Sequence, residues 1–394
     1  SYTFRCSKKI WDKKDLDWNR EINMTTLDIS IQALEHNIDI IRELAGRSQI
    51  IAVLKGNAYG LGLCRFAAFL EKRGIRHFAV TELSDAIALR DNNIEGEILL
   101  LTPIHDAESI TLAIKNGITM SVTSYENGKV IEQTAGYLNH FFAHVHMCID
   151  TGFGRYGFLY NDEPEVKGRC IEEITDISQN MHHIHVTGIY SHFHAACSKN
   201  ECSVRNQFDL FEELCGSLED DGVLVGMKHI SSSTSLVRFP DMNLDAVRIG
   251  SAFLGRLAVE NPYDFANVCK LSAAVDDIYE LPAGHNVGYG TGFRLAKATR
   301  TAVVSAGYFH GLGMTRETNY RRPSFLGMLR LCKHACINKK TTATFDGRSM
   351  PVLGQINMNS CILDASRVKI AVGDQVSFPI NPLFVNSSVP RVYC

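Results

Sequence analysis

Several charged and polar side chains lie at the ends of short apolar segments. In folds with parallel strands, catalytic and binding residues are commonly found at such strand ends. Lys55 closes the run IIAVLK, Arg155 follows the run HMCID, and His192 ends the run GIYSH. Ser233 and Arg248 lie in or next to two further runs of this kind. A lysine at the end of a buried strand is costly unless it is used, because burial disfavours its charged form and lowers its pKa. Lys55 is therefore a candidate for Schiff-base chemistry.

The segments that would position these residues alternate between two kinds from about residue 28 to residue 251. Apolar runs rich in β-branched residues are expected strands at 50–55, 77–81, 97–101, 119–123, 143–150, 185–192, 227–232 and 246–251. Stretches with helical spacing are expected helices at 31–44, 64–73, 84–92, 107–116 and 205–218. Eight strands joined by helices can close a (β/α)8 TIM barrel, which would gather the strand ends at one site. The same alternation also permits an open, doubly wound sheet.

The sequence changes character after about residue 265. Short β-rich runs at 271–278, 300–305, 343–345, 368–372 and 375–378 are separated by Gly, Asn and Pro. This pattern predicts a second, mostly β domain. The expected organisation is an N-terminal leader over 1–24 associated with the β domain, a (β/α)8 barrel over 25–265, and a β-rich C-terminal domain over 266–394. The predicted fold class is therefore α/β, a TIM barrel followed by a mostly β domain.

The composition narrows the class of partner. The 394 residues carry 40 Lys+Arg and 43 Asp+Glu, a net charge of −3, whereas nucleic-acid binders usually carry a basic excess. No apolar run approaches the roughly 18 residues of a membrane span, so no transmembrane helix is expected within these residues. Because the charge is nearly balanced, a small-molecule partner is expected. The 12 cysteines are scattered, which favours a reducing, cytoplasmic compartment over a disulfide scaffold. The group of His192, His194, Cys197 and Cys202 lacks the paired spacing of a zinc site, so no metal is expected.

Segments spread along most of the chain, from roughly residue 25 to 393, resemble the signature segments of alanine racemases in the same order. They are IAVLKGNAYGLG, CIDTGFGRYGF, YSHF, SSSTSLVRFPD, AVRIGSAFLG, NVGYGTGF, VVSAGYFHG, GQINMNS and VPRVY. Alanine racemases are pyridoxal 5'-phosphate (PLP) enzymes of fold type III, in which a barrel is followed by a β domain, so the resemblance favours the closed barrel. It implies an isomerase that interconverts the L- and D-forms of a small amino acid, alanine or serine, and supplies D-amino acids for peptidoglycan.

The resemblance also implies which barrel residues bind PLP. Lys55 would hold the cofactor covalently and exchange a proton with one face of the substrate. Arg248 would face the pyridine nitrogen, which would stay unprotonated because a guanidinium cannot accept a proton. His192 would lie behind the pyridine ring. The remaining implied contacts are Arg155 at the phenolate oxygen and Tyr59, Ser233, Gly250 and Ser251 at the phosphate.

A second acid/base is implied in the β domain. Racemisation removes a proton from one face of the Cα and returns one to the other, so two groups must flank that atom. Tyr308 would oppose Lys55 and would come from the partner subunit, which implies a homodimer with shared active sites. Arg155 and the backbone amide of Met358 would meet the substrate carboxylate. The substrate contacts implied in addition are Asn359 and Ser387.

Three positions depart from the family pattern. Cys148 stands where many members have a modified lysine that orients the arginine at the position of Arg155, so another group must hold Arg155. Asn359 replaces a carboxylate near the site entrance. Ser387 replaces an aromatic residue that crowds the substrate methyl group, and a serine there leaves room for a larger or more polar side chain.

Ser387 and the basic, Met-less start of the chain keep one alternative open, the catalytic domain of a membrane-anchored serine racemase of the vancomycin-resistance type. Its location would be the cytoplasmic face of a membrane, if an upstream domain has been removed. Two further classes are a fold-type-III amino-acid decarboxylase and a non-catalytic PLP-binding protein. The decarboxylases share the two-domain plan but not the GYFHG and QINMN segments, and the single-domain PLP carriers lack the β domain.

Overall fold

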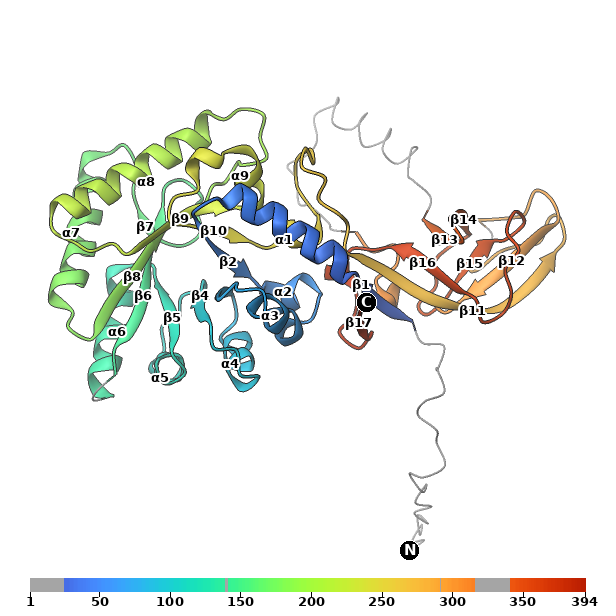
Figure 1. The fold of residues 1–394 in the computed structure, drawn as a ribbon, viewed down its shortest axis with the longest axis horizontal. Coiled ribbons are helices and arrows are strands. Elements are labelled where there is room, and N and C mark those ends of the chain that lie inside the picture. Colours follow the sequence, from blue (N-terminus) through green and yellow to red (C-terminus); the bar gives the residue numbers. More distant parts are fainter. Residues whose placement is uncertain (1–24, 139–140, 291, 316–340) are drawn as a thin grey trace, which may run out of the picture. The chain divides into compact units, whose positions relative to one another are not determined.

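Two units make up the chain, a barrel and a β-rich unit, in the computed structural model shown in Figure 1. The structure describes residues 25–138, 141–290, 292–315 and 341–394, and the predicted leader over 1–24 lies outside the described residues. The barrel unit comprises Asp28–Cys269 with Asn381–Leu383 and Arg391–Cys394, and the β unit is built mainly from Lys270–Ile380.

Eight parallel strands close the barrel. Around the barrel the strands are in the order β5-β4-β3-β2-β10-β9-β8-β6, each paired with the next. The last strand, β6, pairs with the first, β5, and closes the ring. Every neighbouring pair is parallel. The strands are β2 (Gln49–Val53), β3 (His77–Val80), β4 (Glu97–Leu100), β5 (Ile118–Val122), β6 (Ala143–Asp150), β8 (Ile184–Tyr190), β9 (Met227–Ser232) and β10 (Ala246–Ile249). The prediction of a closed (β/α)8 barrel is confirmed, and the open sheet is excluded.

Helices lie around the barrel strands (Figure 1); α1 precedes the first of these strands, and the others come after it. They are α1 (Ile31–Ala45), α3 (Leu63–Glu71), α4 (Leu83–Asp91), α5 (Ala107–Lys115), α6 (Tyr125–Tyr137), α7 (Pro164–Asn180), α8 (Cys202–Asp220) and α9 (Ser233–Arg238). A short turn, α2 (Lys55–Tyr59), follows β2, and a two-residue strand, β7 (Phe158–Leu159), pairs with β6.

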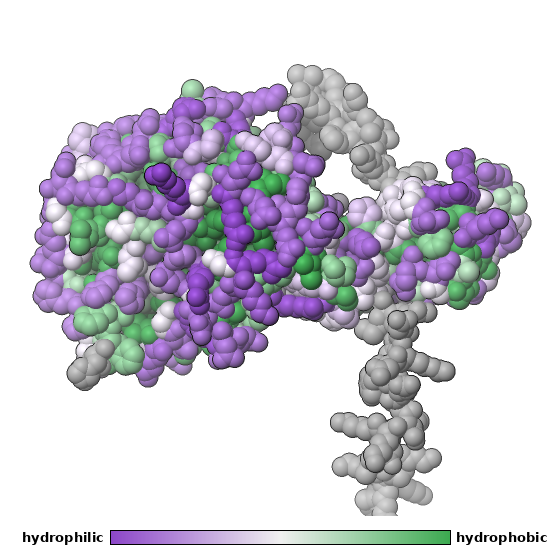
Figure 2. Space-filling view, viewed as in Figure 1, coloured by the Kyte–Doolittle hydropathy of each residue, from purple (hydrophilic) through white to green (hydrophobic). Residues whose placement is uncertain are grey.

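Local sequence explains where these helices begin and which side they bury. The Ser30 hydroxyl accepts the N–H of Ala33 at the start of α1, and Asp106 and Ser124 cap α5 and α6 in the same way. The buried side of α1 presents residues at helical spacing, namely Leu34, Ile38 and Ile41. Hydrophilic residues cover most of the face of the barrel unit seen in Figure 2, with apolar residues visible mainly between them.

The β unit is built on antiparallel strands. Their order is β12-β15-β14-β13-β16-β11, and β12 also pairs with β11. The strands are β11 (Cys269–Leu281), β12 (Thr299–Val304), β13 (Thr342–Phe345), β14 (Arg348–Leu353), β15 (Cys361–Asp364) and β16 (Gln375–Pro379). Among the described residues the first and last strands are β1 (Thr26–Ile29) and β17 (Arg391–Tyr393). Short 3-10 turns occur at Pro240–Met242, Ser251–Leu254, Tyr308–His310 and Pro382–Phe384.

One expected strand is wrong. Residues 368–372 form an irregular loop instead of a strand. The guanidinium of Arg300 donates to the carbonyl oxygens of Val368 (3.0 Å) and Ile370 (2.8 Å), which therefore have partners without a neighbouring strand. In the parts of the chain that the structure describes, no helix combines the length and the apolar character needed to cross a membrane.

Candidate active site

A cavity of about 380 Å³ opens at the C-terminal ends of the barrel strands. All the barrel residues to which the resemblance assigned roles line it, namely Lys55, Tyr59, Arg155, His192, Ser233, Arg248, Gly250 and Ser251. Lys55, Arg155 and Arg248 bring positive charge to its wall, and none of the residues that the structure places around it is Asp or Glu. The cavity is thus strongly biased towards an anionic ligand.

A left-handed turn follows Lys55 and sets the position of both Lys55 and Tyr59. Gly56, Asn57 and Ala58 have φ between 54° and 62° and ψ between 48° and 51°, and Tyr59 has φ 54°. Consecutive non-glycine residues rarely adopt this conformation, because Cβ crowds the following carbonyl oxygen. The Asn57 side chain stabilises the turn by accepting the N–H of Leu63 (2.8 Å). The turn thus brings a lysine and a tyrosine four positions apart to the same cavity.

The surroundings of Lys55 favour its neutral amine. Burial lowers its pKa, and the positive charges of Arg155 and Arg248 lower it further. A neutral amine can act as a nucleophile or accept a proton, whereas an ammonium can do neither. This matches the chemistry expected of a lysine at the end of a buried strand.

Ser233, Gly250 and Tyr59 form one corner of the cavity. The Ser233 hydroxyl accepts the N–H groups of Gly250 (3.1 Å) and Ala252 (3.2 Å). A Cβ at position 250 would collide with the Tyr59 hydroxyl, so only glycine allows the ring to lie there. Burial raises the pKa of Tyr59 to about 12, so its hydroxyl stays protonated and can donate. Hydroxyl and backbone N–H groups at one corner suit a phosphate.

Arg248 lies in the barrel interior and is held entirely by neutral acceptors. Its Nη1 donates to His229 Nδ1 (2.6 Å), and its Nη2 donates to the Ser191 carbonyl (2.6 Å) and to His192 Nδ1 (3.1 Å). Because His229 accepts at Nδ1, its proton is on Nε2, which donates to His146 Nδ1 (2.9 Å). A buried chain of hydrogen bonds thus fixes the guanidinium from behind.

His192 remains neutral at physiological pH. Burial, followed by the charges of Arg248, Arg155 and Lys55, lowers its pKa to about 3. The Phe153 ring lies against it, with the ring centroids 5.1 Å apart. A neutral, immobile imidazole of this kind can support a flat aromatic ligand in the cavity.

Cys148 supplies no charge to Arg155. Its thiol donates to the Tyr156 carbonyl (3.4 Å), and burial raises its pKa to about 11. Among the described residues no carboxylate pairs with Arg155, whose guanidinium lies over the Phe153 ring, 4.5 Å from its centroid. Many family members have at this position a modified lysine that orients the arginine. Here Cys148 does not provide such a charged group, so Arg155 must be oriented by other residues.

In the β unit, Tyr308 and Met358 belong to two turns that are joined to each other. The Tyr308 N–H donates to the Asn357 carbonyl (3.0 Å), and the Phe309 N–H donates to the Met358 carbonyl (2.9 Å). Tyr308 and Met358 are about half exposed, at 49% and 52%.

The two other implied substrate contacts, Asn359 and Ser387, are also exposed residues of loops. Ser387 lies in the loop Asn386–Ser388, where the side chain of Asn386 accepts the N–H of Ser388 (2.9 Å). Their roles at the substrate stay predictions.

Three buried polar residues around the site were not found from the sequence. His146 and His229 form the chain behind Arg248, and Gln207 on α8 joins two loops of the cavity. Gln207 carries a usable signal, because it is a polar residue on the otherwise apolar side of α8, between Val204 and Leu210. The two histidines lie within strands, where nothing in their spacing distinguishes them from other strand residues.

Comparisons with known proteins find one family for both units. The family "Alanine racemase, N-terminal domain" matches residues 29–257, and "Alanine racemase, C-terminal domain" matches residues 268–381. Alanine racemase 1 of Caldanaerobacter subterraneus is 29% identical over 90% of this chain and 85% of its own length. An amino-acid racemase of Enterococcus faecalis is 32% identical over 89% of this chain but only 46% of its own length. The alanine racemase structure from Clostridium difficile 630 has a TM-score of 0.79 at 26% identity, covering 94% of this chain and 96% of that one.

Proposed function

The chain belongs to the alanine racemase family, and on that basis we propose that it is a PLP-dependent racemase that interconverts L- and D-alanine. The relatives named above are alanine racemases and an amino-acid racemase, so the comparisons do not favour the serine racemase alternative. They also support a racemase over a decarboxylase or a non-catalytic PLP-binding protein.

The observation that carries this proposal is the charge imbalance of the cavity. Lys55, Arg155 and Arg248 line it without a single carboxylate among the described lining residues. Arg248 is only 5% exposed, and a buried charge is costly unless it is paired, so such a site suits a ligand that brings negative charge. PLP carries a phosphate and a phenolate oxygen, and an amino acid adds a carboxylate. The donor set therefore fits both the cofactor and the substrate.

The residues would divide the binding of PLP among them. Ser233, Tyr59 and the N–H groups around Gly250 and Ser251 would hold the phosphate at the corner described above. Arg248 would donate to the pyridine nitrogen and, being unable to accept a proton, would keep that nitrogen unprotonated. When bound, PLP withdraws electrons from the Cα of the amino acid and makes its proton easier to remove.

The proton transfers are assigned to two groups of this chain. Lys55 Nζ would take or return the Cα proton on one face, and its lowered pKa increases the fraction that is ready to accept one. Tyr308 Oη would act on the opposite face. We assign this tyrosine to the partner subunit of a homodimer, because the family resemblance implies it and because the side chain is half exposed in the β unit.

The substrate carboxylate would be bound by Arg155 and by the backbone amide of Met358. Arg155 presents a planar set of donors that matches a carboxylate. Asn359 and Ser387 would lie near the substrate side chain and the entrance. A serine at position 387 offers less bulk than an aromatic ring, so the site would tolerate a side chain larger than methyl.

Reductive trapping tests the proposal directly. Borohydride treatment of the PLP-loaded protein should fix the cofactor on a peptide containing Lys55, and mass spectrometry would locate it. The Lys55→Arg variant should trap none, whereas Lys115→Arg, at an exposed position on α5, should trap as the unaltered protein does. In deuterated water L-alanine should exchange its Cα proton without releasing carbon dioxide. A colourless protein that takes up no PLP would overturn the proposal.

A further inference from the structure

Arg155 needs a positioning group that is not a carboxylate. Its long side chain has many rotamers, and no ion pair restricts it among the described residues. The described contacts of its guanidinium are with two aromatic rings, Phe153 at 4.5 Å and Tyr156 at 5.7 Å from the ring centroids. A cation above the face of an aromatic ring is attracted to it, so Phe153 restrains the guanidinium.

The Phe153 ring is itself held in place. Its other neighbour is the neutral ring of His192, 5.1 Å away and tilted by 50°. The His192 ring is fixed in turn by Arg248, which donates to its Nδ1. Arg155, Phe153 and His192 thus form a stack that reaches from the open side of the cavity to the barrel interior.

The backbone that carries Phe153 is fixed by Asp150. Its carboxylate accepts the N–H groups of Gly152 (2.8 Å), Phe153 (2.8 Å) and Gly154 (2.9 Å). Gly152 has φ 129° and Gly154 has φ 74°, which glycine adopts without strain. The loop is therefore wound around one carboxylate, and Phe153 lies at its centre.

Gln207 connects this loop to the loop that carries His192. It is 2% exposed, and all four hydrogen-bonding positions of its amide are used. Oε1 accepts the N–H of His194 (3.0 Å) and its Nδ1–H (2.8 Å), and Nε2 donates to the His192 carbonyl (3.1 Å) and to Thr151 Oγ1 (3.3 Å). The Thr151 hydroxyl in turn meets that of Ser191 (2.9 Å). Two loops from neighbouring strands are thereby fixed by one side chain.

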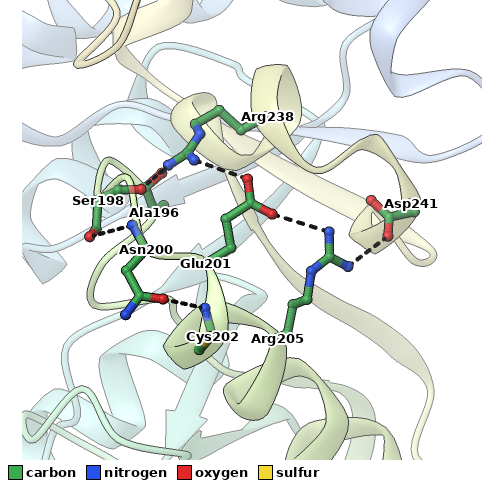
Figure 3. A network of polar contacts seen from close by, with 8 residues as sticks. All are labelled: Ala196, Ser198, Asn200, Glu201, Cys202, Arg205, Arg238 and Asp241. Carbon is green, nitrogen blue, oxygen red and sulfur yellow. Dashed lines mark hydrogen bonds and ion pairs between the residues drawn. The ribbon is translucent and has the colours of Figure 1, made fainter.

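The far end of the His192 loop has a separate anchor, drawn in Figure 3. Arg238 donates to the Ala196 carbonyl (2.7 Å) and to that of Ser198, and it pairs with Glu201 (3.2 Å). Glu201 also pairs with Arg205 (3.2 Å). Because this network holds the loop independently, a change at Gln207 should disturb the part next to the cavity and leave the rest in place.

We propose that Phe153 and Gln207 are positioning residues for Arg155. The Phe153 ring holds the guanidinium of Arg155 by a cation–π contact, and Gln207 fixes the two loops that hold this ring. The inference rests on the proposed function, since it takes Arg155 as the group that binds the substrate carboxylate. It assigns to an aromatic stack the role that a charged partner would otherwise have.

Variants of Phe153 give the first test. Phe153→Leu should raise the KM for L-alanine about fivefold, the size expected for a cation–π contact at a partly exposed site, and leave kcat within about twofold. The Kd for PLP should change less than the KM, because Arg155 is only one of several residues proposed to bind the cofactor. Phe153→Tyr keeps the ring face and should restore the KM. Phe141→Leu removes an exposed ring at the opposite end of the barrel and serves as the control.

Gln207→Glu gives the second test, because it keeps the size of the side chain but loses both donors. It should raise the KM as Phe153→Leu does, and the double variant should be no worse than the more affected single variant. Gln179→Glu, an exposed change on α7, should leave the KM unchanged. A KM that is unchanged in Phe153→Leu, one that Phe153→Tyr fails to restore, or fully additive effects would overturn the inference.

A calorimetric titration of the holoenzyme with propionate separates this inference from the proposed function. Propionate offers a carboxylate but no amino group, so it reports on Arg155 without any turnover. Weaker propionate binding in Phe153→Leu would uphold the inference even if the protein racemised nothing. Equal propionate binding in Phe153→Leu and the unaltered protein would overturn the inference even in an active racemase.

Discussion

Replacing His229 should destabilise the barrel, because this side chain joins Arg248 to His146. The His229→Leu variant loses the bond from Arg248 Nη1 (2.6 Å) and the bond to His146 Nδ1 (2.9 Å), while the volume of the side chain changes little. A hydrogen bond from a charged donor contributes about 1.5–3 kcal/mol, and a bond between two neutral rings about 1 kcal/mol. The expected loss in the free energy of unfolding is therefore about 3 kcal/mol.

Urea unfolding at pH 7.5, followed by circular dichroism, would measure this loss. His229→Gln offers an acceptor to Arg248 and a donor to His146, so it should recover about half of the stability. His182→Leu changes an exposed histidine before β8 and should stay within about 0.5 kcal/mol of the unaltered protein. If His229→Leu also stayed within that range, the hydrogen bonds would not have the energetic weight assigned to them.

Three further changes have clear expected outcomes. Gly250→Ala forces the Tyr59 hydroxyl aside and should raise the Kd for PLP at least tenfold, on the order of 1.4 kcal/mol, as measured by absorbance titration. Burial lowers the pKa of His146 to about 4 and that of His192 to about 3, so below pH 6.5 the unfolded chain binds protons that the folded protein does not. Acid titration of stability should then show a loss of about 1.4 kcal/mol per histidine per pH unit down to pH 4, and a flat profile would contradict it. Ser387→Tyr should lower kcat/KM for L-serine more than for L-alanine, and an equal effect on both would show that Ser387 does not face the substrate side chain.

The barrel could be predicted from the sequence because its signals are local. Apolar runs of four to eight residues mark the strands, and Lys55 is conspicuous because it ends such a run. The strand expected at 368–372 failed because its carbonyl groups are satisfied by Arg300, a residue far away in the sequence. The periodicity of a segment depends only on its own residues, so it gives no information about a hydrogen-bonding partner that is distant in the sequence.

The parts of the site that the sequence did not predict depend on contacts between loops. Asn57 is of a residue type that tolerates the left-handed conformation, but Ala58 and Tyr59, which also have positive φ, carry no signal for it. Gln207 could have been flagged as a polar residue on an apolar helix side, but its four partners lie on loops 13 to 56 residues away. Such contacts become visible only when the fold brings the loops together.

Several unfavourable features of the barrel unit lie at the end where the ligand is proposed to bind. The left-handed conformation costs roughly 1–2 kcal/mol for each of Ala58 and Tyr59 and less for Asn57, because asparagine tolerates it better. Arg248 adds a buried positive charge that no described carboxylate around the cavity offsets. An anion bound next to Arg248 and Arg155 would reduce the electrostatic repulsion at this end of the barrel. A ligand whose free concentration is a hundred times its Kd would stabilise the folded state by about 2.7 kcal/mol. The same arrangement that makes the ligand-free barrel less stable thus favours an anionic ligand, because a neutral molecule of equal shape would relieve none of the charge.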